Sequence, residues 1–278
     1  GVVAAPCARR PRVGVLVTGD ELVEPQDRLR PGAVRNTNAY AVAAQAVEAG
    51  AEVVLSDTVA DDREATVAAI ERALGLDVVV ICGGMSVGAH DHVRPALAEL
   101  GVERGFFGVA LKPGKPTWFG VHRYRGGERR VALRDQRRGA LGNEGRGTLA
   151  FGLPGNPVSA MVTFHLFVRP ALAALAGACP GGATVPATMV DDYLKAPGRT
   201  HAVRCRAELR GGEWLVRPLS GQGSHVLTSM VQADALALLG TQRGNVRAGE
   251  PVEVDFLGPP PTGRAGPWPY SRDAGECP

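Results

Sequence analysis

The sequence predicts an α/β protein, in which a mostly parallel, three-layer sheet domain is followed by a small all-β domain. Short β-branched runs alternate with helical segments over the first 177 residues, and glycine closes several of these segments. Residues 183–257 instead carry short alternating runs with glycine-rich breaks and no long helical pattern. Repeated strand–helix alternation is typical of a parallel sheet that helices cover on both faces.

The first strand–helix–strand unit is predicted from a strand at 13–17, a helix at 39–49 that stops at Gly50, and a strand at 52–56. A second helix is expected at 62–74. It begins with an acidic pair, Asp61 and Asp62, and has Glu64 in a capping-box position.

A strand at 78–82 and a glycine-rich loop come next, followed by a short helix at 91–100 and a further strand at 102–109. A longer helix at 157–176 opens with proline, which is favoured at the first helical position.

The predicted domain boundaries are 12–178 and 183–257, and residues 258–278 form a proline- and glycine-rich tail without predicted order. Within the first domain, residues 122–148 form a long insertion that holds eight arginines. A nucleic-acid-binding arm would need interleaved aromatic residues, and Tyr124 is the sole example, so we expect a solvated hairpin.

Composition excludes several classes of protein. The 278 residues are 45% hydrophobic and carry a net charge of +3, which does not argue for nucleic-acid binding. No uninterrupted apolar run of about 18 residues indicates a membrane span. The five cysteines are scattered without a Cys-x-x-Cys pair, so a cytoplasmic protein without disulfide or zinc framework is expected.

Four glycine- and proline-rich turns follow short apolar runs, at 18–21, 83–88, 112–116 and 153–157. Ligands of parallel sheets lie beyond the carboxyl ends of the strands. We therefore expect a single crevice for a phosphorylated or oxyanionic ligand, in which carboxylates hold Mg²⁺ and lysines hold anionic oxygens. The acids and lysines expected there are Glu21, Asp61, Asp91, Lys112 and Lys115.

Local structural roles compete with this interpretation. Asp61, together with Asp62, is at least as well explained as a helix cap, and Asp91 also precedes a helix. Lys112 and Lys115 could be solvated loop residues. The turn at 154–157 is explained equally well by a structural strand-to-helix connection.

Six motifs occur in an order that resembles the molybdenum insertases, the MoeA and gephyrin E-domain family. They are Val-Thr-Gly-Asp-Glu-Leu (17–22), Asn-Thr-Asn (36–38), Asp-Asp (61–62), Gly-Gly-Met-Ser-Val-Gly with Asp91 (83–91), Lys-Pro-Gly-Lys-Pro (112–116) and Gly-Leu-Pro-Gly-Asn-Pro-Val-Ser-Ala (152–160). Gly-Gln-Gly-Ser (221–224) resembles the carboxyl-terminal β domain of the same family.

The resemblance implies a transferase that binds adenylylated molybdopterin and molybdate, hydrolyses the adenylate with Mg²⁺, inserts the metal into the dithiolene and releases AMP. Glu21, Asp61, Asp91, Lys112 and Lys115 match the family's catalytic positions, with Glu21 and Asp91 as metal ligands. The expected ligand-binding positions are Thr18, Gly19, Asp20, Gly83, Gly84, Ser86, Gly88, Pro116, Pro154, Gly155, Asn156, Ser159, Arg204 and Ser224.

The chain departs from the family at some positions. Asn36 stands where an aspartate is usual, so we expect it to cap a helix rather than bind metal. Full-length members begin with two further domains that help to form a homodimer. Because this sequence starts at Gly1, we expect either that the chain was trimmed or that those domains are missing. The partners implied are the two substrates, a second copy and the adenylyltransferase. Alternative functions are the adenylyltransferase itself, whose glycine loop differs, and a non-enzymatic scaffold.

Overall fold

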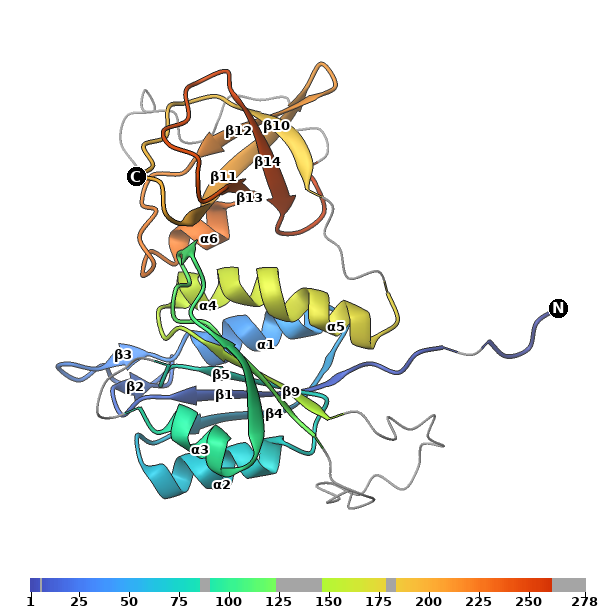
Figure 1. Cartoon of the computed structure of the whole chain (residues 1–278), viewed down its shortest axis with the longest axis vertical. Helices are drawn as coiled ribbons and strands as arrows, with labels where there is room; N and C mark the ends of the chain where they lie inside the picture. The colour runs from blue at the N-terminus through green and yellow to red at the C-terminus, as the bar shows by residue number, and fades with distance from the viewer. Residues whose placement is uncertain (6, 86–90, 124–146, 179–183, 262–278) are drawn as a thin grey trace.

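The computed structural model describes residues 1–5, 7–85, 91–123, 147–178 and 184–261. In these ranges the chain forms two six-stranded sheets and a small two-stranded one. The first sheet, sandwiched between helices, forms the lower part of Figure 1, and the small β domain lies above it. The predicted α/β class with a following β domain is confirmed.

The first sheet has the order β4-β1-β5-β9-β8-β6. Its strands are β1 (Arg12–Thr18), β4 (Glu52–Val59), β5 (Val78–Cys82), β6 (Val102–Phe107), β8 (Trp118–His122) and β9 (Thr148–Leu153). The strands β4, β1, β5 and β9 pair in parallel, whereas β8 is antiparallel to both of its neighbours. The mostly parallel sheet is thus as predicted.

One strand of this sheet differs from expectation. The run predicted at 102–109 ends at Phe107 and forms the edge strand β6, which pairs with antiparallel β8. The place beside β5 belongs to β9, where Cys82 pairs with Leu153. Since β8 and β9 pair antiparallel from His122 and Thr148 onward, the arginine-rich insertion joins a hairpin. Residues 124–146 of that insertion lie outside the described residues.

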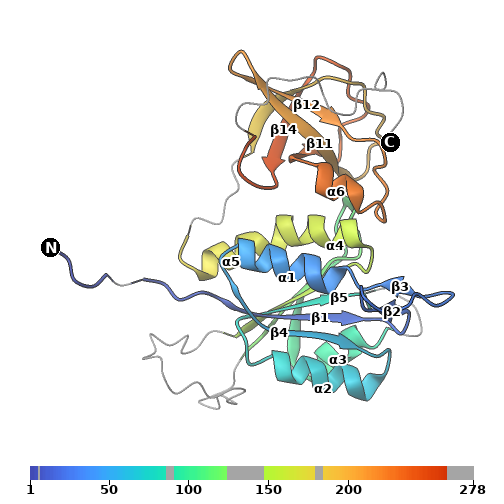
Figure 2. The ribbon, with the colours of Figure 1, turned by 180° about the vertical axis from the view of Figure 1, so that it is seen from behind.

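Helices cover both faces of the first sheet. On one face lie α1 (Asn38–Glu48) and a run made of α4 (Pro157–Thr163), the π-helix η1 (Phe164–Val168) and α5 (Arg169–Leu175), and on the other lie α2 (Arg63–Ala73) and α3 (Val93–Glu99). Figure 2 shows the same two layers from behind.

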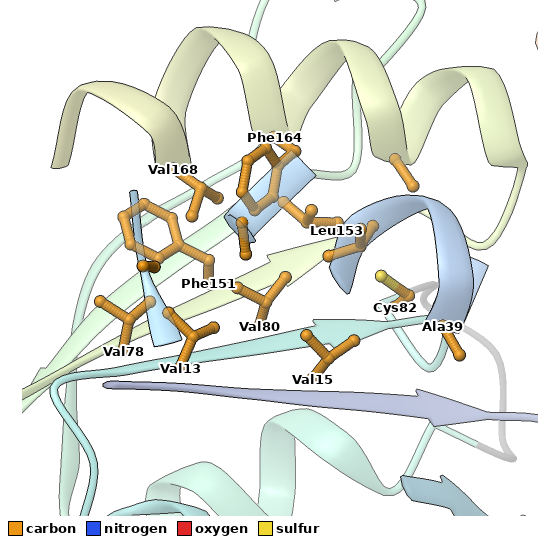
Figure 3. Close-up of a cluster of buried hydrophobic side chains, with 14 of the residues drawn as sticks. Val13, Val15, Ala39, Val78, Val80, Cys82, Phe151, Leu153, Phe164 and Val168 are labelled. Atoms are coloured by element: carbon orange, nitrogen blue, oxygen red, sulfur yellow. The ribbon is translucent and has the colours of Figure 1, made fainter. Parts of the chain in front are cut away.

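The core on the α1 and α4 face is rich in valine and alanine, with leucine and phenylalanine side chains from β9 and the helical run. Val13, Val15, Val78 and Val80 point from the central strands toward Phe164 of the helical run (Figure 3). Valine fits a strand buried on both faces, because its branched side chain packs well on the pleated surface.

The second sheet closes on itself through β12–β11 pairing and has the order β12-β10-β14-β13-β11-β7. Its strands are β7 (Leu111–Lys112), β10 (Val185–Met189), β11 (Thr200–Arg210), β12 (Glu213–Pro218), β13 (Ala235–Leu239) and β14 (Pro251–Phe256), with the short helix α6 (Thr228–Gln232) beside them. The two-residue strands β2 (Leu22–Val23) and β3 (Val34–Arg35) pair separately.

The helical run 157–175 lies between the first sheet and the small β domain. An apolar cluster joins Val158 and Val162 of α4 to Ala202 of β11 and Leu236 of β13. By length and composition this run could cross a membrane, but half of its most apolar part is buried inside the protein, against the first sheet and in this junction. In the part of the chain that is described, no other helix meets that test.

Candidate functional site

The carboxyl ends of β1, β5 and β9 bring three of the predicted turns side by side. The register pairs Val17 with Cys82 and Cys82 with Leu153, so the turns after these strands start at one level. The backbone N–H of Gly83 donates to the carbonyl oxygen of Leu153 at 3.1 Å. Since β1 is flanked by β4 and β5, and the helices α1 and α2 lie on opposite faces, this is the switch point where parallel sheets bind ligands.

Glycine at position 83 is required by close backbone packing. Its φ of +93° is a left-handed conformation, and a Cβ there would lie 2.7 Å from the carbonyl oxygen of Thr18. A side chain would also cover the backbone that faces the switch point, so the glycine keeps this backbone open to a ligand.

Three buried polar atoms near this edge have no hydrogen-bond partner among the described residues. They are the Thr18 hydroxyl oxygen, Asn38 Oδ1 and Asp91 Oδ1. The amide of Asn38 also donates to the carbonyl oxygen of Gly155 at 2.7 Å, which ties the start of α1 to the turn after β9. Buried polar groups are nearly always satisfied, so unsatisfied ones at a strand edge mark a place for a polar ligand.

The acids after β1 and β4 lie together. The backbone N–H of Asp61 donates to Asp20 Oδ1 at 3.0 Å. A Cβ on Gly19 would lie 2.6 Å from a carboxylate oxygen of Glu21, so the Glu21 side chain folds over Gly19. Asp20, Glu21 and Asp61 are therefore gathered at the carboxyl edge, as predicted.

The capping alternative for Asp61 is not what the structure shows. Asp62 is the N-cap of α2, and its Oδ1 accepts from the N–H of Ala65 at 2.9 Å. Asn36 lies one residue before Thr37, the N-cap of α1, and its Oδ1 accepts from the N–H of Ala39 in the first turn of that helix at 3.2 Å.

Asp91 does not cap α3, which starts two residues later. Its side chain is nearly buried, and its Oδ2 accepts from Arg94 Nε at 2.9 Å. Arg94 was missed in the sequence, although its spacing of three residues from an acid before a helix is a usable signal. In the described ranges no three His, Cys, Asp or Glu side chains group as metal ligands, so Glu21 and Asp91 as metal ligands stay a prediction.

The turn after β9 also contacts the small β domain. Asn156 Nδ2 donates to the Ser224 hydroxyl at 3.0 Å, and the backbone N–H of Val158 donates to the Ser224 carbonyl at 3.1 Å. Ser159 is buried in the first turn of α4. The 153–156 turn thus contacts both the strand edge and Ser224, one of the expected ligand-binding residues.

Arg204 is a buried cation without a carboxylate partner in the described residues. It is 1% exposed, and its Nε donates to the Ser229 hydroxyl at 3.2 Å. Its Nη2 donates to the carbonyl oxygens of Gly221 and Gly223 at 3.4 and 3.3 Å. Burial lowers the pKa of the Arg204 guanidinium.

A glutamine fastens the Ser224 loop to the arginine strand. Gln222 accepts from the N–H of Arg204 at 3.1 Å and donates to the carbonyl oxygen of Arg204 at 2.8 Å. Gln222 and Ser229 were not singled out in the sequence, although both lie in or beside the Gly-Gln-Gly-Ser motif. A buried, unpaired arginine held by neutral groups is a suitable binding site for an anion.

The lysine segment follows the edge strand β6, which runs in the same direction as β9 because both strands are antiparallel to β8. Its strand β7 pairs with β11, so the segment leads from this end of the sheet to the small β domain. A Cβ on Gly114 would lie 2.4 Å from the Thr163 side chain, which places the segment against α4. The segment therefore connects the sheet to the small β domain, and a single crevice that gathers the acids and the lysines stays a prediction.

Of the remaining predicted residues, Pro116 is half-buried in the lysine segment and Pro154 is buried at the end of β9. Gly84 has a φ of +59° and lies against Val93 and Thr18. Ser86 and Gly88 fall within 86–90, outside the described residues.

A parallel sheet with polar residues at its switch-point edge is joined to a small β domain that carries a buried arginine without a described carboxylate partner, and this is the architecture of a two-part protein. The chain belongs to the molybdopterin-binding family: residues 14–174 match the family described as "Probable molybdopterin binding domain", and residues 186–257 match the "MoeA C-terminal region (domain IV)".

Relatives support this assignment. The chain is 31% identical over 256 residues to a protein of Bacillus subtilis and 34% identical over 264 residues to one of Haemophilus influenzae, both named molybdopterin molybdenumtransferase. These matches cover 91% and 92% of this chain but 54% and 58% of the relatives. The chain thus spans little more than half the length of these relatives.

A solved structure agrees. The molybdopterin biosynthesis MoeA protein of Pyrococcus horikoshii is 30% identical to this chain and superposes with a TM-score of 0.68. The match covers 89% of this chain and 55% of that protein.

Proposed function

We propose that this chain is the ligand-binding part of a molybdenum insertase, which transfers molybdenum to molybdopterin. The observation that carries the proposal is the buried, unpaired Arg204 beside Ser224, in a small β domain that packs on a molybdopterin-binding fold. The relatives named molybdopterin molybdenumtransferase support the same activity.

The switch-point edge is the proposed seat of adenylylated molybdopterin. Glycine backbone at positions 19, 83, 84 and 155 allows close approach, and the unsatisfied Thr18 hydroxyl offers a hydrogen bond to a polar ligand. Asn38 adds a residue that the sequence interpretation left out. Ser86 and Gly88 remain proposed contacts of the same loop.

The junction with the small β domain is the proposed seat of molybdate. Arg204 and Ser224 supply a cation and a hydroxyl there, and Ser159 and Lys115 come from the neighbouring α4 and lysine segment. Preorganised donors and cations stabilise an oxyanion best where water is excluded, and Arg204 is buried.

The acids at the carboxyl edge of the first sheet provide some of the ligands that Mg²⁺ requires. This ion is usually held by one or two carboxylates together with substrate phosphates and water, and Asp91 has an oxygen without a described partner. We assign the ion to Asp91 and Glu21, where it would neutralise charge on the phosphoanhydride that is hydrolysed. Asp61 and Asp20 hold the β1 and β4 loops in place around it.

Because the chain spans little more than half of its relatives, the whole protein's reaction and assembly are also proposals. We propose a cytoplasmic homodimer, in which segments beyond those matched here take part, and a contact with the adenylyltransferase that supplies the substrate.

The test uses this chain alone and together with the part of the Haemophilus relative that this chain does not match. Each is incubated with adenylylated molybdopterin, molybdate and Mg²⁺, and AMP release and activation of an apo-molybdoenzyme are measured. Release of AMP with activation in either mixture supports the proposal. Binding of the substrate without AMP release in both mixtures would identify a scaffold instead.

A parallel mixture tests the adenylyltransferase alternative with molybdopterin and ATP. Formation of the adenylate there would refute the insertase assignment. We expect none, because the match to the MoeA C-terminal region covers residues 186–257.

A further inference from the structure

The strand β11 divides the basic residues of the small β domain between two sides. Ala202 packs with Val158 and Val162 of α4, whereas Val203 and Cys205 belong to the core inside the small β domain. Successive side chains of a strand point to opposite faces. Arg204 therefore lies on the α4 side with Ala202, and His201 lies on the inner side with Val203.

The pairing of β7 assigns Lys112 to the His201 side. Leu111 pairs with Thr200, and Lys112 pairs with His201, in parallel register. Leu111 packs in the α4-side cluster, so Lys112 points to the opposite face. Neighbouring strands are about 4.8 Å apart, which puts Lys112 next to His201 and away from Arg204.

His201 is buried and held at one nitrogen. It is 6% exposed, and its Nδ1 lies 3.2 Å from the Tyr193 hydroxyl. Within the described residues its Nε2 has no hydrogen-bond partner. Lys195 is also buried, and its Nζ donates to the carbonyl oxygens of Ala196 and Arg243 at 3.4 and 2.6 Å.

Positive charge gathers around this ring. Burial, and then the charges of Lys112, Lys195 and Arg199, lower the pKa of His201 to about 4. Lys112 and Arg199 are exposed and form no ion pair with a carboxylate in the described ranges.

Acids of the adjoining loops are engaged elsewhere. Asp192 accepts from Arg247 at 3.0 Å, and Glu250 accepts from Arg243 at 2.8 Å. Lys112, Lys195 and Arg199 thus surround a neutral histidine, and the acids of the adjoining loops pair with other arginines. The resulting local excess of positive charge attracts anions.

We propose that Lys112, Arg199 and Nε2 of His201 form a second subsite, for a tetrahedral oxyanion such as molybdate or a phosphate monoester. Lys195 and Tyr193 are its positioning residues. The identity of the ligand rests on the proposed function, and the subsite itself rests on the arrangement of these side chains.

Tyr193 suits this role in either protonation state of the histidine. Its hydroxyl can donate to Nδ1 of a neutral ring or accept from a protonated one. An anion at Nε2 favours the protonated ring, so oxyanion binding is coupled to proton uptake by His201.

The experiment follows the histidine ring signals of the isotope-labelled full chain by NMR. Sodium molybdate, sodium phosphate and AMP are titrated separately at constant ionic strength, and the loss of signals in His201→Gln assigns the ring. We expect a saturable shift of the His201 signals. If molybdate or inorganic phosphate saturates the shift, the ligand is a free oxyanion. If AMP saturates it, the ligand is a phosphate monoester. Either result supports the subsite.

Matched variants separate a specific site from general attraction. Arg199→Gln should weaken the apparent affinity by about tenfold, because a charge-assisted hydrogen bond is lost. Arg104→Gln removes the same charge from the exposed edge strand β6 and should leave the affinity unchanged.

The subsite is refuted if none of the three ligands gives a saturable shift of the His201 signals. It is also refuted if the shift persists in Arg199→Gln but disappears in Arg204→Met. AMP release is measured independently. Insertase activity without the His201 shift would refute the subsite alone, and the shift without insertase activity in any mixture would refute the proposed function alone.

Discussion

At the scale of single residues, the absence of a carboxylate partner among the described residues distinguishes the candidate functional arginine of β11 from a structural one. Arg204 is buried without a carboxylate among the described residues, whereas Arg206, two positions along the same strand, pairs with Asp234 at 3.2 Å. A protein rarely buries an unpaired charge unless something else compensates it. A bound oxyanion would provide that compensation.

We expect Arg204→Met to lower molybdate affinity at least tenfold, because a desolvated cation is lost, while the free energy of unfolding changes by about 1 kcal/mol or less. Calorimetric titration and denaturant unfolding measure the two quantities. Arg210→Met, at the exposed end of the same strand, is the control and should alter neither. Equal affinity in Arg204→Met and the unaltered chain would remove Arg204 from the site.

Gly83→Ala should destabilise the fold by about 2 kcal/mol or more and abolish binding of adenylylated molybdopterin, since the new Cβ meets the Thr18 carbonyl. Gly101→Ala is the control, because its φ is also positive but nothing lies within 4 Å of its Cβ. That change should cost about 1 kcal/mol and leave binding intact. Similar losses in both variants would show that backbone conformation, and not the close contact, matters at position 83.

His201 predicts a pH dependence of stability. Its pKa is 6.5 in the unfolded chain and about 4 in the folded one, so the unfolded state binds more protons between these values. The free energy of unfolding should therefore fall as pH drops from 6.5 toward 4. Urea unfolding at several pH values measures this, and His201→Gln should flatten the dependence in that window. An unchanged slope in the variant would assign the effect to other groups.

At the scale of elements, each loop after a strand of the parallel sheet combines a structural residue with a candidate functional one. After β4, Asp62 caps α2 while Asp61 bonds to the loop after β1. The adjacent positions thus make different contacts, which the sequence pattern alone could not separate.

This division is tested by a pair of neighbouring variants. Asp62→Ala should lower the free energy of unfolding by about 1 kcal/mol through loss of the cap, with little effect on AMP release. Asp61→Ala should have the reverse profile, with reduced AMP release and near-normal stability. Thermal unfolding and the AMP assay measure both, and identical profiles would contradict separate roles.

At the scale of the whole molecule, the helical run 157–175 joins the two sheets. Its α4 segment packs on Ala202 and Leu236 of the small β domain, and further along the run His165 Nε2 lies 3.0 Å from Asp255 Oδ2 of β14. The same run covers the core of the first sheet through Phe164 and Val168 (Figure 3). The two candidate binding groups are therefore held relative to each other by one helical run.

Val162→Asp should uncouple the two parts, because an acid buried in the apolar junction has no partner. Calorimetry should then show two transitions in place of one, and AMP release should fall. Ala174→Asp, exposed on the same run, is the control and should keep a single transition. A single transition in both variants would mean that the junction does not couple the parts.

The sequence by itself determined the local elements and the turns of the first sheet. Valine runs, glycine stops and proline at the start of α4 act over a few residues, and the structure confirms the strands and helices built from them. It also determined that acids follow β1 and β4, since the order of residues along a strand fixes what stands at its end.

Only the tertiary structure decided which distant segments meet. The pairing of two-residue β7 with β11, the edge position of β6 and the burial of Arg204 depend on contacts between residues far apart in the chain. A strand of two residues carries too little periodicity to identify its partner, and a strand's place in a sheet is set by packing of the whole domain. For that reason the sequence did not indicate that the lysine segment pairs with the small β domain.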